Sequence, residues 1–320
     1  MNASPAALVG AARTGDRAAL ARLLTVVESG GEDARLAMRE IPAIVPDTAS
    51  VVGITGAPGA GKSTLTDRLV ALLRAGDHRV AVLAVDPTSP FSGGAILGDR
   101  VRMQRHDTDP GVFVRSMATR GHLGGLTRSA PQAVRVLGAA GFAWVVVETV
   151  GVGQVEVEIA GTADTSVVVV NPGWGDGVQA SKAGLLEIGD VFVVNKADRD
   201  GVASTVRDLR AMLELAGDRA WVPPIVETVA TEGRGVDALR DAIDAHRAHL
   251  LASGELGRRR EGRVREELRG IILEAVLAEA ENAWSGDRFA TVAGRVAAGE
   301  LDLYTAATVL RDGADFGGVG

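Results

Sequence analysis

The chain has 320 residues, of which 46% are hydrophobic and 23% charged, and its formal net charge at pH 7 is −7. This composition is typical of a folded globular protein and excludes disorder as the main state. The acidic balance argues against a nucleic-acid partner, and the longest apolar runs fall short of the ~20 residues that a membrane-spanning helix requires. The absence of cysteine excludes disulfides, thiolate metal sites and cysteine nucleophiles, and it favours a cytoplasmic protein.

Residues 1–48 are predicted to form a helical N-terminal extension. Apolar residues recur there at helical spacing, and Gly15-Asp16 interrupts the pattern. Pro42 and Pro46 mark the boundary to the next part of the chain.

Residues 49–250 alternate short runs rich in valine and isoleucine with segments of helix length. Because these runs are apolar on both faces, they predict a mostly parallel sheet with helices on both sides, which is the α/β fold class. The predicted strands are Val51–Thr55, Val80–Val85, Val112–Arg115, Trp144–Val147, Val167–Val170, Val191–Val194 and Ile225–Val229.

The last part of the chain, residues 251–320, is predicted to be a helical C-terminal extension. A basic cluster runs from Arg258 to Arg265, and an apolar stripe at helical spacing follows from Leu268. The chain therefore divides into a central α/β domain and two helical extensions.

A glycine-rich segment directly follows the first predicted strand. It has the spacing G-x-x-x-x-G-K-[ST] and precedes an amphipathic helix, which is the context of a phosphate-binding loop. Glycines let backbone N–H groups converge on phosphate oxygens, Lys62 reaches the β- and γ-phosphates, and the Ser63 hydroxyl ligates Mg²⁺. The motif predicts that a nucleoside triphosphate binds to Gly56, Ala57, Pro58, Gly59, Ala60, Gly61, Lys62, Ser63 and Thr64.

The motif N-K-x-D follows the sixth predicted strand, at the edge of a parallel sheet where ligands bind. The Asp198 carboxylate can accept two hydrogen bonds from the ring N–H and the exocyclic amine of guanine, whereas adenine presents a different donor pattern. Lys196 would cover the purine ring with its aliphatic stem, and Asn195 would brace neighbouring loops. The sequence therefore predicts GTP and GDP as the nucleotides.

Three carboxylates are candidates for the Mg²⁺ site, and two of them end predicted strands. Glu148 stands where many GTPases carry the aspartate of D-x-x-G, with a helix cap as the alternative. Asp86 ends the second predicted strand. For Asp99, in a glycine-rich stretch, a metal ligand and a helix N-cap are both open.

Hydrolysis is the default reaction, because the sequence offers no nucleophile to accept a phosphoryl group. Gln154 is the nearest polar candidate for orienting the attacking water. A further glycine-rich loop, residues 171–177, is a candidate for a segment that orders with the γ-phosphate or a partner. Its Trp174 is either a partner contact or packed on the neighbouring helix.

These motifs, in this order, closely resemble the MeaB family, a group of SIMIBI-class P-loop GTPases also known under the names ArgK and LAO transport ATPase. The glutamate at position 148 matches the family pattern, and both helical extensions are similar to those of the family. The residues that carry the resemblance are 56–64, 85–89, 93–100, 115–126, 148–154 and 195–198.

The resemblance implies a homodimeric GTPase that acts as a chaperone of an adenosylcobalamin-dependent acyl-CoA mutase, with residues 251–320 as the dimerisation region. GTP would gate the delivery of cofactor from an adenosyltransferase and the release of inactivated cofactor. The resemblance assigns catalysis to Lys62, Asp99, Glu148 and Gln154. It assigns Mg²⁺ binding to Ser63, Asp86, Asp99 and Glu148. Asp176 and Lys182 fall in a partner-responsive switch, and Val229 and Ala230 replace a Ser-Ala pair behind the guanine.

Two other functions are weighed against this one. A nickel-delivery GTPase would share the nucleotide domain, but it needs a Cys/His cluster to capture the metal. The chain has no cysteine, and this argues against nickel delivery. An amino-acid kinase, as the name ArgK suggests, would transfer phosphate to arginine or ornithine.

Overall fold

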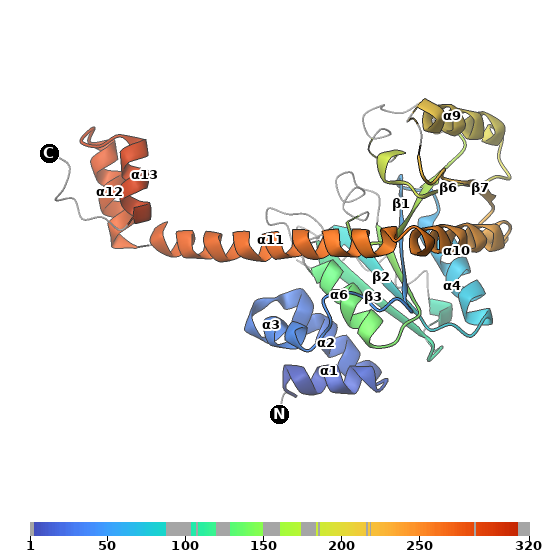
Figure 1. Ribbon diagram of the computed structural model, residues 1–320, viewed down its shortest axis with the longest axis horizontal. Coiled ribbons are helices and arrows are strands. Elements are labelled where there is room, and N and C mark those ends of the chain that lie inside the picture. The colour runs from blue at the N-terminus through green and yellow to red at the C-terminus, as the bar shows by residue number, and fades with distance from the viewer. Residues whose placement is uncertain are drawn as a thin grey trace. The chain divides into compact units, whose positions relative to one another are not determined.

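Figure 1 shows the computed structural model, which describes residues 3–87, 104–106, 108–119, 129–149, 161–173, 184, 186–215, 217, 219–284 and 286–312. The chain divides into two compact units, Met1–Arg263 and Val264–Gly320. The division lies within one helix, α11 (Glu255–Trp284). The domain boundaries that the sequence predicts at residues 48 and 250 stay predictions.

The first unit contains a sheet of seven parallel strands in the order β3-β2-β4-β1-β5-β6-β7. Each strand contains or overlaps one of the predicted apolar runs, so the predicted α/β fold is confirmed. The described strands are β1 (Ser50–Gly56), β2 (Val80–Pro87), β3 (Val112–Thr119), β4 (Trp144–Thr149), β5 (Thr165–Val170), β6 (Val191–Asn195) and β7 (Ile225–Thr228).

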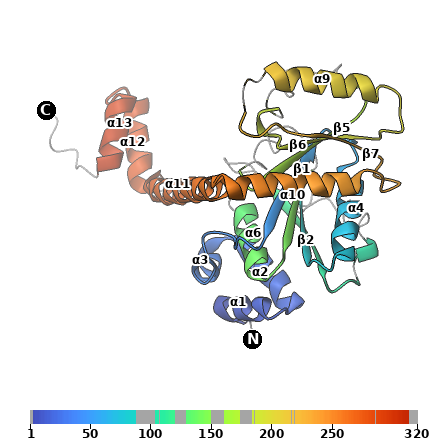
Figure 2. The same cartoon turned by 45° about the vertical axis from the view of Figure 1, so that its right-hand side comes forward.

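Helices cover both faces of this sheet, and the views in Figures 1 and 2 agree on the layers. One face packs against α4 (Lys62–Ala75) and α10 (Val236–Ala252). The other packs against α6 (Ser129–Ala139) at one end and α9 (Val202–Leu215) at the other. Successive valines of β4 and β5 point to opposite faces and are all buried, which is why these runs read as continuously apolar.

The helical N-terminal extension is confirmed and consists of α1 (Pro5–Arg13), α2 (Arg17–Ser29) and α3 (Gly31–Arg39). The predicted break is a cap: the Asp16 carboxylate accepts hydrogen bonds from the N–H groups of Ala18 and Ala19, each at 2.9 Å. Leu20, Leu23 and other apolar residues of these helices join the core beneath α6.

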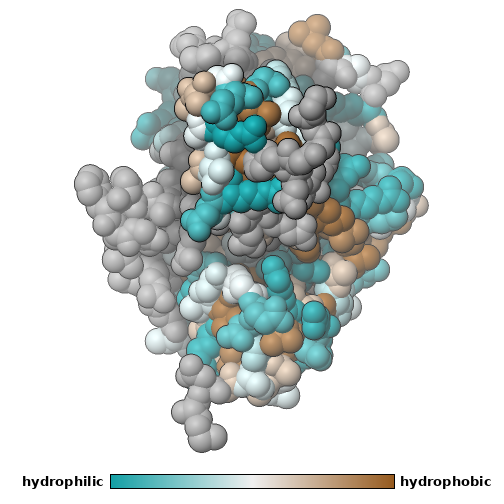
Figure 3. Space-filling model, turned by 90° about the vertical axis from the view of Figure 1, so that its left-hand side faces the viewer, coloured by the Kyte–Doolittle hydropathy of each residue, from teal (hydrophilic) through white to brown (hydrophobic). Residues whose placement is uncertain are grey.

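The second unit holds the later part of α11 together with α12 (Asp287–Ala297) and α13 (Leu303–Asp312). The last two helices pack against each other. Among the described residues, no helix is both long and apolar enough to cross a bilayer. Figure 3 shows hydrophobic residues lying among hydrophilic ones on the described surface.

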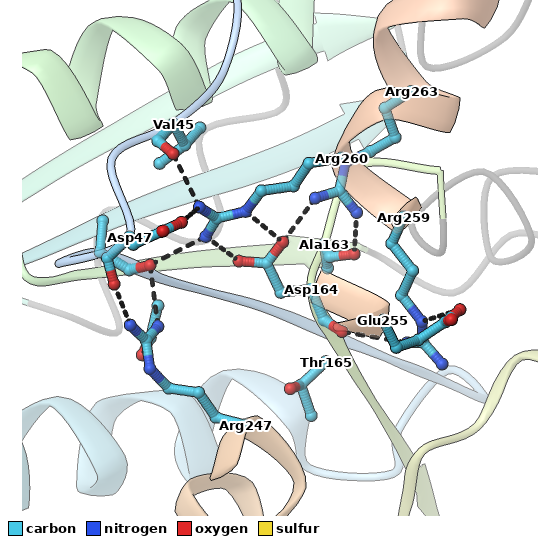
Figure 4. A network of polar contacts seen from close by, with 12 residues as sticks. Val45, Asp47, Ala163, Asp164, Thr165, Arg247, Glu255, Arg259, Arg260 and Arg263 are labelled. Atoms are coloured by element: carbon cyan, nitrogen blue, oxygen red, sulfur yellow. Dashed lines mark hydrogen bonds and ion pairs between the residues drawn. The ribbon is translucent and has the colours of Figure 1, made fainter. Parts of the chain in front are cut away.

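The first turns of α11 are held by a buried ion-pair network in the first unit, drawn in Figure 4. Arg260, which is 3% exposed, binds both carboxylate oxygens of Asp164 at 3.1 and 2.6 Å. Its remaining N–H groups donate to the carbonyls of Val45 and Ala49 and to the carboxylate of Asp47. One guanidinium thus joins α11, the segment before β1 and the residue before β5.

Two neighbouring arginines extend this network. Arg263 donates to the Asp164 carboxylate and to the carbonyl of Ala163, and Arg259 binds Asp190, which precedes β6. Burial alone would raise the pKa of Asp164, but the bonds from Arg260 and the charges of Arg263 and Arg260 outweigh it. The pKa of this carboxyl is therefore held below its ordinary value.

We expect Asp164→Asn to lower the free energy of unfolding by about 3–5 kcal/mol, because it leaves buried guanidinium groups without their carboxylate. Urea unfolding at pH 7 measures the loss. Asp47→Asn is the matched control, since Asp47 binds the same Arg260 with a side chain that is 78% exposed, and we expect it to cost less than about 1 kcal/mol. Equal losses in the two variants would contradict this interpretation.

The same network predicts part of the pH dependence of stability. A carboxyl with a depressed pKa stabilises the folded state above its unfolded pKa of about 4, and this contribution is lost as the pH falls through the folded pKa. The wild-type protein should lose stability in that acidic range, and Asp164→Asn should flatten this part of the curve.

Candidate functional site

The predicted site residues of the described chain meet at one edge of the sheet. Because all described strands are parallel, the segments that follow β1, β4, β5, β6 and β7 leave the sheet at the same edge. The phosphate loop leaves β1 and enters α4, so the N-terminus of that helix, which favours anions, also lies there. The tip of the loop, Pro58 and Gly59, is exposed.

Two glycines of the phosphate loop have no room for a side chain. At Gly56, which has a φ of +136°, a Cβ would lie 2.0 Å from the carbonyl oxygen of Val169 on β5. At Gly61, which has a φ of +92°, a Cβ would lie 2.3 Å from the amide nitrogen of Asn195. Glycine at both positions lets the loop pass close to β5 and β6.

Lys62 begins α4 and directs its ammonium back to the loop. Its Nζ donates to the carbonyls of Gly56 at 2.8 Å and of Ala57 at 3.0 Å. The side chain is buried, which makes a lysine costly there unless its charge is used. A phosphate oxygen would replace these neutral acceptors with charge-assisted ones, which are stronger.

Ser63 and Glu148 are joined although they stand 85 residues apart in the sequence. The Ser63 hydroxyl donates to Oε1 of Glu148 at 2.5 Å, and both side chains are buried. Next to them, Thr149 at the end of β4 donates to Thr55 on β1 at 3.1 Å. The hydroxyl of the phosphate loop and the carboxylate at the end of β4 thus form one oxygen-rich site.

Asn195, the last residue of β6, holds the phosphate loop and the loop after β7 together. Its amide Nδ2 donates to the carbonyl of Ala60 at 2.8 Å. Its Oδ1 accepts from the Thr228 hydroxyl at 3.0 Å and from the Ala230 N–H at 3.1 Å. The side chain is 2% exposed, so it acts as an internal brace between the two loops.

Lys196 adopts a left-handed backbone conformation with a φ of +60°, which is uncommon for a residue with a side chain and is concentrated at functional sites. Its Nζ donates to the carbonyl of Gly59 at 2.7 Å, so its stem spans from β6 to the phosphate loop. Asp198 follows in the same turn with an exposed side chain. Val229 and Ala230, in the loop after β7, are buried.

Several predicted residues fall outside the described chain. Asp86 lies on the described backbone of β2, but its side chain is outside the described part, and Asp99, Gln154, Asp176 and Lys182 lie outside it entirely. No role was predicted for Arg68 from the sequence, and Asn171 was predicted only as the first residue of the glycine-rich loop 171–177. Asn171 follows β5, and its side-chain amide donates to the carbonyl of Gly59 at 3.4 Å. No sequence motif predicts this contact.

A phosphate loop between β1 and α4, with a second motif after β6 at the same edge, defines a P-loop nucleoside triphosphatase. The chain belongs to the MeaB family: the family described as "Methylmalonyl Co-A mutase-associated GTPase MeaB" matches residues 20–285. The protein is accordingly a GTP hydrolase that binds guanine nucleotides.

Relatives and a solved structure agree with this assignment. A protein of Pyrococcus abyssi with the name "Putative GTPase" is 49% identical over 307 residues, which cover 95% of this chain and 94% of that protein. The mitochondrial "Methylmalonic aciduria type A homolog" of Mus musculus is 34% identical over 82% of this chain and 68% of that protein. A crystal structure described as an LAO/AO transport system kinase has a TM-score of 0.67 and 29% identity, and the match covers 98% of each chain.

Proposed function

We propose that this GTPase is a chaperone of an adenosylcobalamin-dependent acyl-CoA mutase, in which GTP gates cofactor delivery from an adenosyltransferase and release of inactivated cofactor. The observation that carries the proposal is the match of residues 20–285 to a family described as mutase-associated. The match includes every strand of the sheet and both nucleotide motifs.

The nucleotide roles that we propose follow from the contacts at the sheet edge. The phosphate loop, residues 56–64, would bind the phosphates, with Lys62 and Ser63 as its charged and hydroxyl groups. The turn after β6 would bind guanine through Asp198 and Lys196. The bonds of Asn195 to Ala60 and Ala230 support this arrangement, because they fix the distance between the two halves of the site.

We propose that Mg²⁺ binds at Ser63 and Glu148, with Asp86 and Asp99 as further predicted ligands. The donor set fits this ion, because a hydroxyl and a carboxylate are hard oxygen ligands and lie within 2.5 Å of each other in a buried place. When bound, Mg²⁺ would neutralise charge on the β- and γ-phosphates. Glu148 contributes a negative charge and holds the Ser63 hydroxyl in position.

Glu148→Gln tests this role, because it removes the charge while an amide oxygen remains for the Ser63 hydroxyl. We expect the Mg²⁺ concentration for half-maximal GTP hydrolysis to rise by about tenfold or more. Magnesium titrations of steady-state hydrolysis measure it, with Glu227→Gln, an exposed glutamate on β7, as the control. An unchanged midpoint in the Glu148 variant would place Mg²⁺ elsewhere.

We propose that the segments around Gln154, Asp176 and Lys182 respond to the γ-phosphate and to the partner. Gln154 would orient the attacking water, and Asp176 and Lys182 would belong to the partner-responsive switch. The support for these roles is the resemblance of their motifs to the family, since the residues lie outside the described chain.

We propose that residues 251–320 form the dimerisation region. Four large apolar residues of α11 are 45–56% exposed and recur at helical spacing on one face: Leu268, Ile271, Ile272 and Val276. A second copy of the same helix would bury this face in a self-complementary contact. In analytical ultracentrifugation, Ile272→Glu should give monomers, while Leu215→Glu on α9 should leave the wild-type dimer intact; a monomeric wild type would exclude the dimer.

The chaperone role is tested by mixing the protein with purified acyl-CoA mutases specific for methylmalonyl-, isobutyryl-, ethylmalonyl- or hydroxyisobutyryl-CoA. One of them should form a complex in gel filtration and accelerate GTP hydrolysis, and GTP rather than GDP should change adenosylcobalamin transfer to it. Lys62→Ala gives the background rate. Absence of both a complex and acceleration with all four would refute the chaperone role.

A phosphoryl-transfer activity is the second candidate, because the matched crystal structure is described as a kinase. Incubation with γ-labelled GTP or ATP and arginine or ornithine tests it. Label in the amino acid would support a kinase, and label only in inorganic phosphate would support hydrolysis.

A further inference from the structure

Arg68 connects the helix of the phosphate loop to the loop after β7. It lies on α4, one residue beyond Asp67, and its guanidinium donates from Nε to the carbonyl of Ala230 at 3.1 Å. The Nη2 group donates to the carbonyl of Thr231 at 2.6 Å. A single planar group therefore holds two successive peptide carbonyls that are more than 160 residues away in the sequence.

The same short loop is held from its other side by the guanine motif. The N–H of Ala230 donates to Oδ1 of Asn195 at 3.1 Å, and Val229 pairs with Arg234 in an isolated bridge. The backbone of Ala230 is thus bound on both sides: its N–H donates to Asn195 of β6, and its carbonyl accepts from Arg68 of α4 and from the N–H of Gly233 at 3.3 Å. Removal of Arg68 would break the link between this loop and α4, and would leave the bond to Asn195 and the bonds within the loop.

The contacts of Arg68 differ from those of the other arginine on α4. Arg74 binds a carboxylate, that of Asp109, through two of its nitrogens at 2.9 and 3.1 Å. Arg68 instead donates to backbone carbonyls and forms no ion pair with another described residue. Its bonds fix a backbone position, which a carboxylate pair on a flexible side chain would not do.

We infer that Arg68 is a positioning residue for base discrimination: it sets the place of the loop 229–231 against the turn that carries Asp198. The inference rests on the proposed nucleotide site. A guanine nucleotide is selected when several groups meet its edge in a fixed geometry, so a loop that moves loses more affinity for guanine than for a base that makes fewer bonds there. Arg68 acts through the backbone of Ala230 and does not contact the base itself.

Lysine cannot replace this arginine fully. The guanidinium presents parallel N–H groups in one plane, which match two neighbouring acceptors, whereas an ammonium is a single point donor on a flexible stem. Arg68→Lys should therefore retain part of the effect, and Arg68→Ala should retain none.

The experiment compares the dissociation constants for GDP and ADP in the wild type, Arg68→Ala and Arg68→Lys by isothermal titration and competition. The exposed Arg207→Ala on α9 is the control for the loss of one positive charge. We expect the GDP constant of Arg68→Ala to rise about tenfold with little change for ADP, so the preference for GDP falls about tenfold. Arg68→Lys should lie between, and the hydrolysis rate at saturating GTP should stay within about twofold.

A preference for GDP that stays unchanged in Arg68→Ala, or that falls equally in Arg207→Ala, would overturn the inference. If Arg68→Ala does not fold, Arg68→Lys decides, since it keeps the charge and stem: an unchanged preference there overturns the inference and a partial fall supports it. A wild-type protein that binds GDP no better than ADP would instead refute the proposed guanine site, which separates the two failures.

Discussion

Lys62→Ala should reduce GTP hydrolysis by at least about 100-fold while the protein stays folded. A cation that meets the charge developing on the β- and γ-phosphates contributes on this scale, because it acts in a site shielded from water. The Lys62 ammonium donates to the carbonyls of Gly56 and Ala57, which belong to the phosphate loop itself. The fold should therefore depend on it little.

The measurement is single-turnover hydrolysis together with thermal unfolding of the nucleotide-free protein. Arg207→Ala, the removal of an exposed cation from α9, is the control and should leave both values unchanged. A Lys62→Ala protein that hydrolyses GTP normally would remove Lys62 from the catalytic residues. One that unfolds without nucleotide would show that the lysine serves the fold.

Asp198→Asn should reduce the preference for GTP over ATP on the order of 10³-fold, because an amide cannot accept both hydrogen bonds from the ring N–H and the exocyclic amine of guanine. It should also create affinity for xanthosine triphosphate, whose carbonyl at the position of that amine accepts a hydrogen bond from the new amide N–H. A gain of this kind cannot result from general damage to the protein.

The control is Asp200→Asn, which changes another exposed carboxylate in the same turn. It should keep the preference of the wild type for GTP. If both variants behave alike, or if Asp198→Asn keeps full preference for GTP and gains no xanthosine binding, the base is read by other residues.

The strands could be predicted from the sequence because the rule behind them is local. Runs such as Val167–Val170 and Val191–Val194 are apolar on both faces, and only a sheet covered on both sides buries them. The end of β3 was predicted four residues early, at Arg115 instead of Thr119. The polar residues Arg115 and Ser116 interrupt the apolar run, although pairing with β2 continues through them.

The candidate site likewise contains some residues that could be predicted from the sequence and others that could not. The phosphate loop and the turn after β6 follow short spacing rules, so residues 56–64 and 195–198 could be predicted as a group. Arg68 could not, because it binds backbone carbonyls and any loop sequence offers those. The pair of Asp164 and Arg260 also has no local pattern, since 96 residues separate the partners and only the fold brings them together.

The most direct test of the account is a calorimetric titration of the wild-type protein with GDP and, separately, with ADP, in the presence of Mg²⁺. We predict saturable binding of one GDP per chain and no comparable heat with ADP. No heat with GDP, or equal binding of both nucleotides, would contradict the assignment of the phosphate loop and of Asp198 to one guanine-nucleotide site.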